Sequence, residues 1–244
     1  MKILKFKLWG KSAFFKKPDV NTYLYFTYSN IHKVALLGIF GAILGYRGYN
    51  QMTKDEDFPE FYEKLKDLKI GIEPKEGSKG VFSKKVQLFN NSVGYASKEQ
   101  GGNLIIKEQW LENPEWNIYL LINSTEAELL EKHIKQYKCT FIPYLGKNDH
   151  LANIEYLGTF DGERVNQVRN INSLVQSKYF EFDEDDEDDN MEECVYKYTE
   201  MLPIKLDKET NMYEYESFIY TNMFVDSMDY DYMYKVDNKN IMFF

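Results

Sequence analysis

Three glycines inside one apolar run constrain the fold of this chain more than any other feature. Gly38, Gly41 and Gly45 lie three and four residues apart within residues 34–45 (VALLGIFGAILG), a spacing that places them on one face of an α-helix. Each glycine costs about 1 kcal/mol in a helix relative to alanine, so we expect another part of the molecule to approach this face closely. Asn30 is the expected N-cap, because its side chain can accept a bond from a helix N–H. The run is too short to cross a bilayer, which needs ~20 apolar residues.

Charge is distributed unevenly along the 244 residues. The net charge is −9, yet residues 1–50 hold eight basic residues and one acidic residue, whereas residues 176–244 hold six and nineteen. A basic N-terminal segment beside an acidic C-terminal one is typical of a nucleic-acid surface next to an unrelated region. We interpret the acidic run at residues 183–189 (DEDDEDD) as a solvated loop, with a metal site or a nucleic-acid mimic as the alternatives.

The apolar periodicity predicts an α+β fold. With 43% apolar and 16% aromatic residues, the chain can build a core and is not expected to be disordered. Alternation of Leu4, Phe6 and Leu8 with lysines predicts a strand with one face in water. Thr125 and Glu128 fit a capping box at the start of a helix. A further helix is predicted over residues 58–68, and further strands over 69–73, 117–122, 140–143 and 154–160.

Two strand–helix–strand passes predict a β-α-β-β-α-β, ferredoxin-like sheet, which is the fold of the RNA recognition motif (RRM). We assign this domain to residues 1–162. Residues 75–102, polar and rich in glycine and lysine, form a long hairpin (thumb) insert, since polar inserts of that length are functional or disordered. Residues 163–244 form a small, acidic, β-rich C-terminal appendage, with strands over 213–224 and 230–236.

Two sequence blocks resemble those of a known family. The first comprises FKKP at residues 15–18, YFTY at 25–28 and the glycine run at 34–45; the second is PYLGKNDHLA at 143–152. In order and spacing they resemble the fifth numbered family of CRISPR-associated (Cas) proteins in the repeat-associated (RAMP) superfamily, most closely the subunit of type I-B Cascade. The chain departs from the family pattern at residues 30–33, where prolines are frequent, and at 16–17, where arginine is common. Nothing recognisable covers residues 163–244.

The resemblance implies a non-catalytic subunit of a type I CRISPR surveillance complex. Such a subunit binds and caps the 5′ handle of the guide RNA (crRNA). It contacts the Cascade backbone subunit through its thumb insert, and the Cascade large subunit docks nearby. The resemblance implies no cofactor, no metal and no membrane partner. The lysine-rich start is not a secretion signal, and Cys139 and Cys194 lack metal-ligand spacing, so a cytoplasmic protein is expected.

Lysines interleaved with aromatic residues suit single-stranded RNA, because lysines neutralise phosphates while rings stack on unpaired bases. We also expect Gly41 to pack on the sheet, and Gly45, followed by Tyr46 and Arg47, to face RNA or a partner. The candidate RNA-binding residues are Lys11, Lys16, Lys17, Tyr25, His32, Lys33, Arg47, Lys79, Lys84 and Lys85.

Catalysis is the alternative to simple binding. Metal-independent RNA cleavage needs a general base and an acid, and the three histidines are the natural candidates. We interpret His133 as a solvated helix residue, His32 as a phosphate contact at a helix start, and His150 as equally suited to packing or RNA contact. No constellation for cleavage can be assembled, so no catalytic residue is assigned. An endoribonuclease acting on CRISPR repeat RNA and a protein-only assembly module remain the two alternatives.

Overall fold

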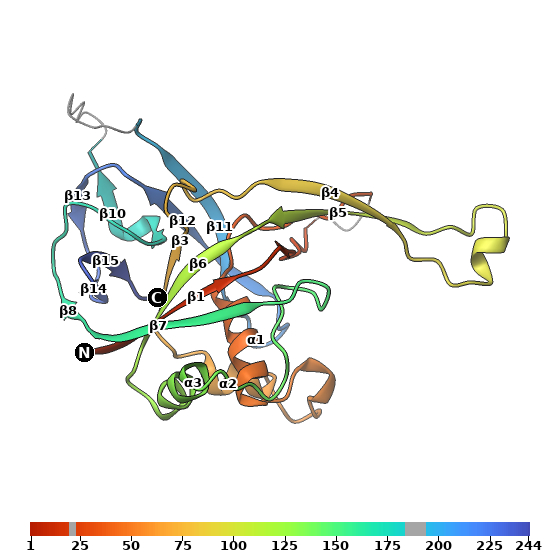
Figure 1. The fold of residues 1–244 in the computed structure, drawn as a ribbon, viewed down its shortest axis with the longest axis horizontal. Helices are drawn as coiled ribbons and strands as arrows, with labels where there is room; N and C mark the ends of the chain where they lie inside the picture. The colour runs from red at the N-terminus through yellow and green to blue at the C-terminus, as the bar shows by residue number, and fades with distance from the viewer. Residues whose placement is uncertain (20–22, 184–193) are drawn as a thin grey trace.

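A four-stranded antiparallel sheet organises the N-terminal part of the molecule (Figure 1). The computed structural model describes residues 1–19, 23–183 and 194–244. The sheet order is β3-β6-β1-β7, with α1 and α2 between β1 and β3 along the chain and α3 between β6 and β7. The prediction of an α+β protein is confirmed. The elements named so far are β1 (Lys2–Trp9), α1 (Lys33–Leu44), α2 (Glu60–Leu65), β3 (Ile70–Pro74), β6 (Glu115–Leu121), α3 (Thr125–Lys135) and β7 (Asn153–Asp161).

The two faces of this sheet are both covered. Leu4, Phe6 and Leu8 of β1 are fully buried in the main core, on the side where the three helices lie. Ile3, on the opposite side, belongs to a second core that includes residues of the C-terminal strands β14 (Met233–Val236) and β15 (Lys239–Met242). Lys5 is therefore only 8% exposed. The prediction of a wet face on this strand is wrong at Lys5, because a strand pair some 230 residues away in sequence covers it.

The N-cap of helix α1 lies two residues after Asn30, the residue that the sequence predicts for this position. The N-cap is His32, whose Nδ1 accepts a hydrogen bond from the backbone N–H of Ala35 at 3.2 Å. Asn30 is instead buried in the core: its side chain donates to the carbonyl of Gly80 at 2.8 Å and accepts from the indole N–H of Trp116 at 3.1 Å. It ties α1 to two other parts of the chain.

The three glycines have three different surroundings. A Cβ at Gly41 would lie 2.5 Å from Cβ of Phe61 on α2, so the close neighbour is a helix and the predicted packing on the sheet is wrong. A Cβ at Gly38 would meet nothing within 4 Å. Gly45 is the left-handed C-cap of α1 with φ of 82°, and a Cβ there would lie 2.8 Å from the Thr140 side chain. The close neighbour of Gly45 is therefore Thr140 of this chain, in place of the RNA or partner that the sequence predicts.

A two-stranded arm projects from the body of the molecule (Figure 1). It consists of β4 (Lys84–Asn90) and β5 (Ile105–Glu112), joined through a tip that contains a short 3₁₀ turn, η2 (Ala96–Lys98). The arm overlaps the hairpin insert predicted over residues 75–102, but it both starts and ends about ten residues later. Phe82 is buried against Trp116, so residues just before β4 belong to the body.

The C-terminal part is built almost entirely from strands. The long antiparallel pair of β11 (Lys197–Leu206) and β12 (Tyr213–Thr221) contacts α1, and β9 (Val175–Gln176) pairs with β12. Pro203 sits at a register shift in β11, where a missing N–H is tolerated. The remaining elements are β2 (Ser12–Ala13), η1 (Tyr49–Gln51), β8 (Glu163–Arg164), η3 (Ser177–Tyr179), β10 (Phe180–Phe182) and β13 (Val225–Met228).

Other predictions meet mixed outcomes. Residues 140–143 form a loop, not the predicted strand. The cap of α3 is Ser124, one residue before the predicted Thr125. Both cysteines are free and exposed. Within residues 1–19, 23–183 and 194–244, no helix is long and apolar enough to span a membrane. The acidic run at 183–189 lies outside the described residues except for Asp183.

Candidate nucleic-acid interface

The outer face of the central sheet is closed by a polar network. Lys5 Nζ lies 2.9 Å from a carboxylate oxygen of Asp237 in the turn between β14 and β15. On the neighbouring strands, Glu73 accepts a hydrogen bond from the Tyr119 hydroxyl at 2.7 Å and pairs with Lys239 of β15. Side chains that could have received bases on this part of the sheet are therefore paired with the appendage.

The lysines converge instead at the root of the arm. Lys17 Nζ lies 3.1 Å from Glu200 Oε1 on β11, and both carboxylate oxygens of Glu200 accept the backbone N–H of Ser29 at 3.0 Å. Lys84, the first residue of β4, donates to the Ser29 hydroxyl at 2.7 Å. Glu200 thus links Lys17 to Ser29, and the Ser29 hydroxyl in turn accepts from Lys84. We call Lys16, Lys17 and Lys84 the arm-root lysines.

A tyrosine-lined pocket opens beside Lys17. Its rings come from Tyr28 in the N-terminal segment and from Tyr198 and Tyr215 on the β11–β12 pair, and Glu200 lies among them. The Tyr28 hydroxyl donates to the Tyr215 hydroxyl at 3.2 Å. Burial raises the pKa values of Tyr28 and Tyr198, so both stay neutral donors. The pocket combines aromatic walls with one lysine, Lys17, and two carboxylates, Asp19 and Glu200.

Further lysines lie over aromatic rings next to the arm. Lys16 Nζ is 4.1 Å from the centroid of the Tyr25 ring. Lys107 Nζ, on β5, is 3.8 Å from the Tyr23 ring centroid and donates to its hydroxyl at 2.6 Å. The backbone N–H of Tyr25 donates to the Lys107 carbonyl at 2.9 Å. These bonds fix the tyrosine-bearing segment along the edge of the arm.

Two of the predicted RNA-binding residues are not available to RNA in this structure. His32 is buried, and burial lowers its pKa to about 3, so it stays neutral and caps α1. Lys33 is buried too, donates to the Phe244 carbonyl at 3.2 Å, and has its pKa lowered by burial to about 8. The sequence placed them at an exposed helix start, whereas the C-terminal strands cover that end of α1.

The remaining predicted residues lie on the surface in different settings. Arg47 follows α1, and its guanidinium is held by Glu56 at 2.6 Å and Glu60 at 3.2 Å. Lys85 on β4 lies 3.6 Å from Glu112. Lys79 lies 5.8 Å from the centroid of the Tyr196 ring, and Lys11 is exposed. The structure therefore brings Lys16, Lys17, Tyr25 and Lys84 together, while carboxylates already neutralise Arg47.

Residues that sequence reasoning missed lie mostly in the appendage. Tyr198, Glu200 and Tyr215 come from a strand pair some 170 residues from the basic block, and no local pattern links the two. Lys107 lies on β5, a strand that the sequence did not predict. Long-range pairing of β11 with β12 is what creates the pocket.

The histidines do not form a catalytic pair at this interface. His133 on α3 has Nδ1 2.9 Å from the carbonyl of Leu129. His150 is buried with Nδ1 2.7 Å from the Ser12 hydroxyl and its ring edge-on to Trp110, and burial lowers its pKa. Neither lies among the arm-root lysines. His150 is a packing residue of the loop before β7.

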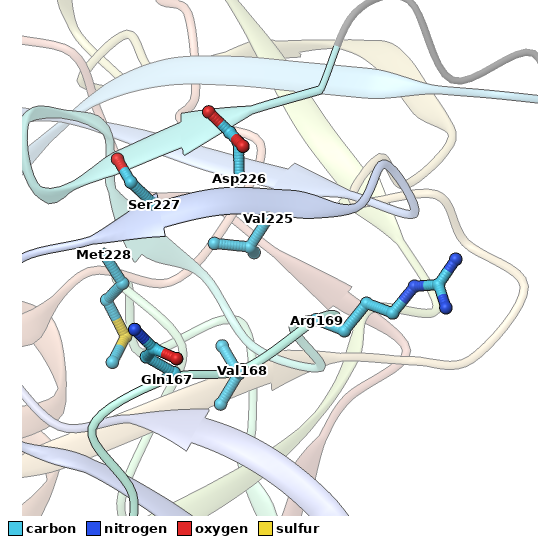
Figure 2. A pocket seen from close by; sticks show the side chains of 7 residues that line it. All are labelled: Gln167, Val168, Arg169, Val225, Asp226, Ser227 and Met228. Carbon is cyan, nitrogen blue, oxygen red and sulfur yellow. The ribbon is translucent and has the colours of Figure 1, made fainter.

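A second pocket lies between residues 167–169 and β13 (Figure 2). The backbone N–H of Val225 donates to the Arg169 carbonyl at 2.8 Å and holds the two segments together. The Arg169 side chain lies over the Phe224 ring, 4.2 Å from its centroid, and points away from Asp226. The charged groups of this pocket do not converge, so it offers no evident chemistry.

Comparison with known proteins identifies the fold. No protein-family model matches the chain, and no curated protein does. A chain of a CRISPR RNA-guided surveillance complex aligns with a TM-score of 0.54 and 11% identity over 92% of this chain and 91% of that chain. A CRISPR protein from Archaeoglobus fulgidus aligns with a TM-score of 0.50 and 7% identity over 99% and 98%.

The architecture defines a class first: an α+β protein with a long antiparallel arm and a strand-rich C-terminal part. Within that class, the chain has the fold of these two CRISPR proteins. The resemblance seen in the sequence is thereby confirmed at the level of the fold.

Proposed function

We propose that this chain is a non-catalytic subunit of a type I CRISPR surveillance complex, most like the type I-B kind, and that it binds and caps the 5′ handle of crRNA. One observation carries the proposal: the arm-root lysines lie among tyrosine rings, with Lys16 over Tyr25 and Lys17 beside the Tyr28 pocket. Stacking of an unpaired base on a ring contributes ~1–3 kcal/mol, and lysines add phosphate neutralisation. This combination suits a single-stranded RNA segment.

The topology supports an RRM-like, ferredoxin-like domain. The order of elements, β1-α1-β3-β6-α3-β7, and the sheet order β3-β6-β1-β7 correspond to a β-α-β-β-α-β arrangement. An RRM stacks bases on its sheet, but here β14 and β15 cover that part of the sheet. We therefore place the RNA at the root of the arm.

The arm supports the expected subunit contacts. It extends away from the body (Figure 1), and its tip carries exposed apolar side chains, with Tyr95 78% exposed and Val93 53% exposed. In the proposed complex the RNA runs between the arm and the body, the arm tip contacts the backbone subunit, and the large subunit docks on the body. Lys11, Lys79 and Lys85 are exposed as well, and we propose that they add phosphate contacts.

The positions of the histidines support the proposal of a non-catalytic role. Metal-independent RNA cleavage needs a base and an acid beside the scissile phosphate, whereas His32 and His150 are buried and His133 lies on α3. A repeat-cleaving endoribonuclease is the alternative enzyme, and a protein-only assembly module is the alternative without RNA.

One experiment separates these three functions. Purified protein is incubated with end-labelled CRISPR repeat RNA and with the isolated 5′ handle, without added metal, and is analysed by gel shift and by denaturing gel. We expect both RNAs to be retained uncut. Cleavage of the repeat would select the endoribonuclease, and failure to retain either RNA would select the assembly module.

A further inference from the structure

Strand β4 leaves one edge of the arm sheet open. The sheet has the order β2-β5-β4, and in the described part of the chain no strand pairs with the outer side of β4. The far side of β5 is already occupied, because the backbone of Tyr25 donates to the Lys107 carbonyl and accepts from the Gln109 N–H, both at 2.9 Å. The arm sheet can therefore still be extended at β4.

The register shows which backbone groups face this open side. Val86 lies opposite Gln109, and Leu88 lies opposite Lys107. Opposite residues of an antiparallel pair direct their N–H and C=O groups either toward each other or both away. Since Gln109 and Lys107 direct theirs toward Tyr25, Val86 and Leu88 direct theirs away from β5. We call the backbone groups of Val86 and Leu88 the β4 edge.

The side chains at the β4 edge are apolar and half exposed. Val86 is 50% exposed and Leu88 53%, and they share one face of the arm because they lie two residues apart in a strand. The Leu88 carbonyl accepts from the side-chain amide of Gln87 at 3.2 Å, a contact open to solvent that an incoming strand would displace. A chain that pairs here must cover apolar side chains as well as bond to the backbone.

Two other edge strands carry features that hinder such pairing. Strand β7 has a register shift next to Gly158, and β11 has one at Pro203. Natural sheets use bulges and prolines to keep their edges from pairing with other chains. Strand β4, in contrast, runs in continuous register with β5 from Lys84 to Asn90, without Pro or Gly and with its lysines confined to the first two positions. The β4 edge lacks the protection that the other two strands have.

RNA and a second copy of this chain fit the β4 edge less well. Phosphates would be repelled by the outward carbonyls, and Val86 and Leu88 offer neither a charge nor a ring to a nucleotide. Self-pairing about a two-fold axis at Gln87 would place Ser92 of one copy beside Phe82 of the other, and Phe82 is buried in the body. The arm tip of each copy would then run into the body of the other.

We propose that the β4 edge binds an extended strand of another protein, which joins the arm sheet beyond β4. In strand addition of this kind, backbone hydrogen bonds give affinity and side-chain contacts give specificity. The partner strand carries apolar side chains at two positions two residues apart, and these cover Val86 and Leu88. That the partner is a subunit of the same complex rests on the proposed function, whereas the β4 edge is a site distinct from the arm tip.

The test uses the whole complex, co-expressed with crRNA and purified through a tag on this chain. Val86→Pro removes the outward N–H and leaves the ladder to β5 intact, because that N–H takes no part in it. Val86→Thr is the matched control, since it keeps the N–H and the β-branched shape. We expect Val86→Pro to reduce the yield of one protein subunit about tenfold, because a hydrogen bond is lost and the ring blocks the strand. Val86→Thr should retain most of that subunit.

Residue-resolved hydrogen exchange detects the pairing directly. In the free wild-type chain the amides of Val86 and Leu88 should exchange fast, while those of Gln87 and Phe89, which face β5, are protected. In the complex all four amides should be protected. The free Val86→Pro variant should keep Gln87 and Phe89 protected, which shows that its arm still folds. If that arm does not fold, the wild-type exchange pattern decides alone.

Four results overturn the proposal. A complete complex from the folded Val86→Pro variant does so, as does an equal loss in Val86→Thr, which would indicate a side-chain contact without strand pairing. Protection of the Val86 and Leu88 amides by crRNA alone would assign the β4 edge to RNA, and protection by dimerisation of the free chain would assign it to a second copy. If the wild-type chain binds no handle RNA while Val86→Pro still loses a subunit, the RNA function fails and the strand site stands.

Discussion

Lys5 on β1 and Asp237 in the β14–β15 turn form an ion pair, with 2.9 Å between Nζ and the carboxylate oxygen. Asp237 and Asn238 both have positive φ, 50° and 62°, as in the tight two-residue hairpin turns of type I′. The turn therefore places the Asp237 carboxylate beside Lys5, the lysine that β14 and β15 bury. This one contact links the end of the chain to its first strand and closes the sheet to RNA at this point.

Replacing Asp237 with asparagine should destabilise the protein. Lys5 would lose its carboxylate partner at a site where its side chain is only 10% exposed, and we expect a loss of about 1–3 kcal/mol, below the range for fully buried pairs because Asp237 is half exposed. Asp161→Asn is the matched control: its pair with Lys2 is exposed on both sides, so its loss should change the stability much less. Chemical denaturation of both variants makes the comparison, and equal losses would refute a special role for Lys5.

The glycines of α1 give opposite predictions for the same substitution. Gly38→Ala should stabilise the protein by about 1 kcal/mol, because alanine favours the helix and a Cβ there meets open space. Gly41→Ala should destabilise it, because the added Cβ would lie 2.5 Å from Cβ of Phe61 and α2 must shift. Thermal melts of the two single variants suffice. If both variants are more stable than the parent protein, α1 and α2 do not pack closely at Gly41 and Phe61.

These glycines also show what sequence can and cannot predict. Their spacing correctly indicated a helix with a close neighbour, and alternation correctly located β1. Spacing could not tell a helix neighbour from a sheet, because the position of Phe61 depends on how α2 docks. In the same way Asn30 looked like a cap, yet its actual partners, Gly80 and Trp116, lie 50 and 86 residues away.

The candidate site was predictable only in its N-terminal half. Lys16, Lys17 and Tyr25 stand in one basic, aromatic block of sequence. Glu200 and the pocket tyrosines of β11–β12 come from a region whose acidic composition pointed away from RNA. His32 and Lys33 were misplaced for the same reason, since the strands that bury them are distant in sequence.

His32 predicts a specific dependence of stability on pH. Its pKa in the folded protein is lowered to about 3, from the ordinary value of 6.5, so the unfolded chain binds a proton that the folded one does not between these values. Stability must therefore fall as the pH drops below about 6.5, by up to about 1.4 kcal/mol per pH unit. His32→Asn, which can still cap α1, should flatten the fall between pH 6.5 and 5. A slope in the His32 variant equal to that of the parent protein would contradict the assignment.

Shortening the arm should abolish assembly with the backbone subunit without affecting the folding of this chain. Because Asn91 and Leu104 face each other across the arm, with the N–H of Asn91 donating to the Leu104 carbonyl at 2.8 Å, residues 92–103 can be replaced by an Asn-Gly turn. The variant should keep the parent melting temperature, since Phe82 and the body are untouched, but fail to co-purify with the backbone subunit. A cut that begins as early as Gly77 would also remove core contacts. Normal assembly of the short-arm variant would show that the tip contributes nothing.

The arm-root lysines should set the salt dependence of RNA binding. Each phosphate contact on single-stranded RNA contributes about 0.7 to the slope of log affinity against log salt concentration, so Lys16→Glu with Lys17→Glu should weaken handle binding and lower this slope by about 1.4. Lys17 is also paired with Glu200. Without Lys17 the Glu200 carboxylate in the pocket is no longer neutralised, and it should repel the RNA phosphates. Arg47→Glu is the matched control: Glu56 and Glu60 already neutralise that guanidinium, so we expect a much smaller change in both affinity and slope. Filter binding from 50 to 300 mM salt measures both quantities. An unchanged slope in the double lysine variant, or an equal drop for Arg47→Glu, would mean that the RNA lies on another surface.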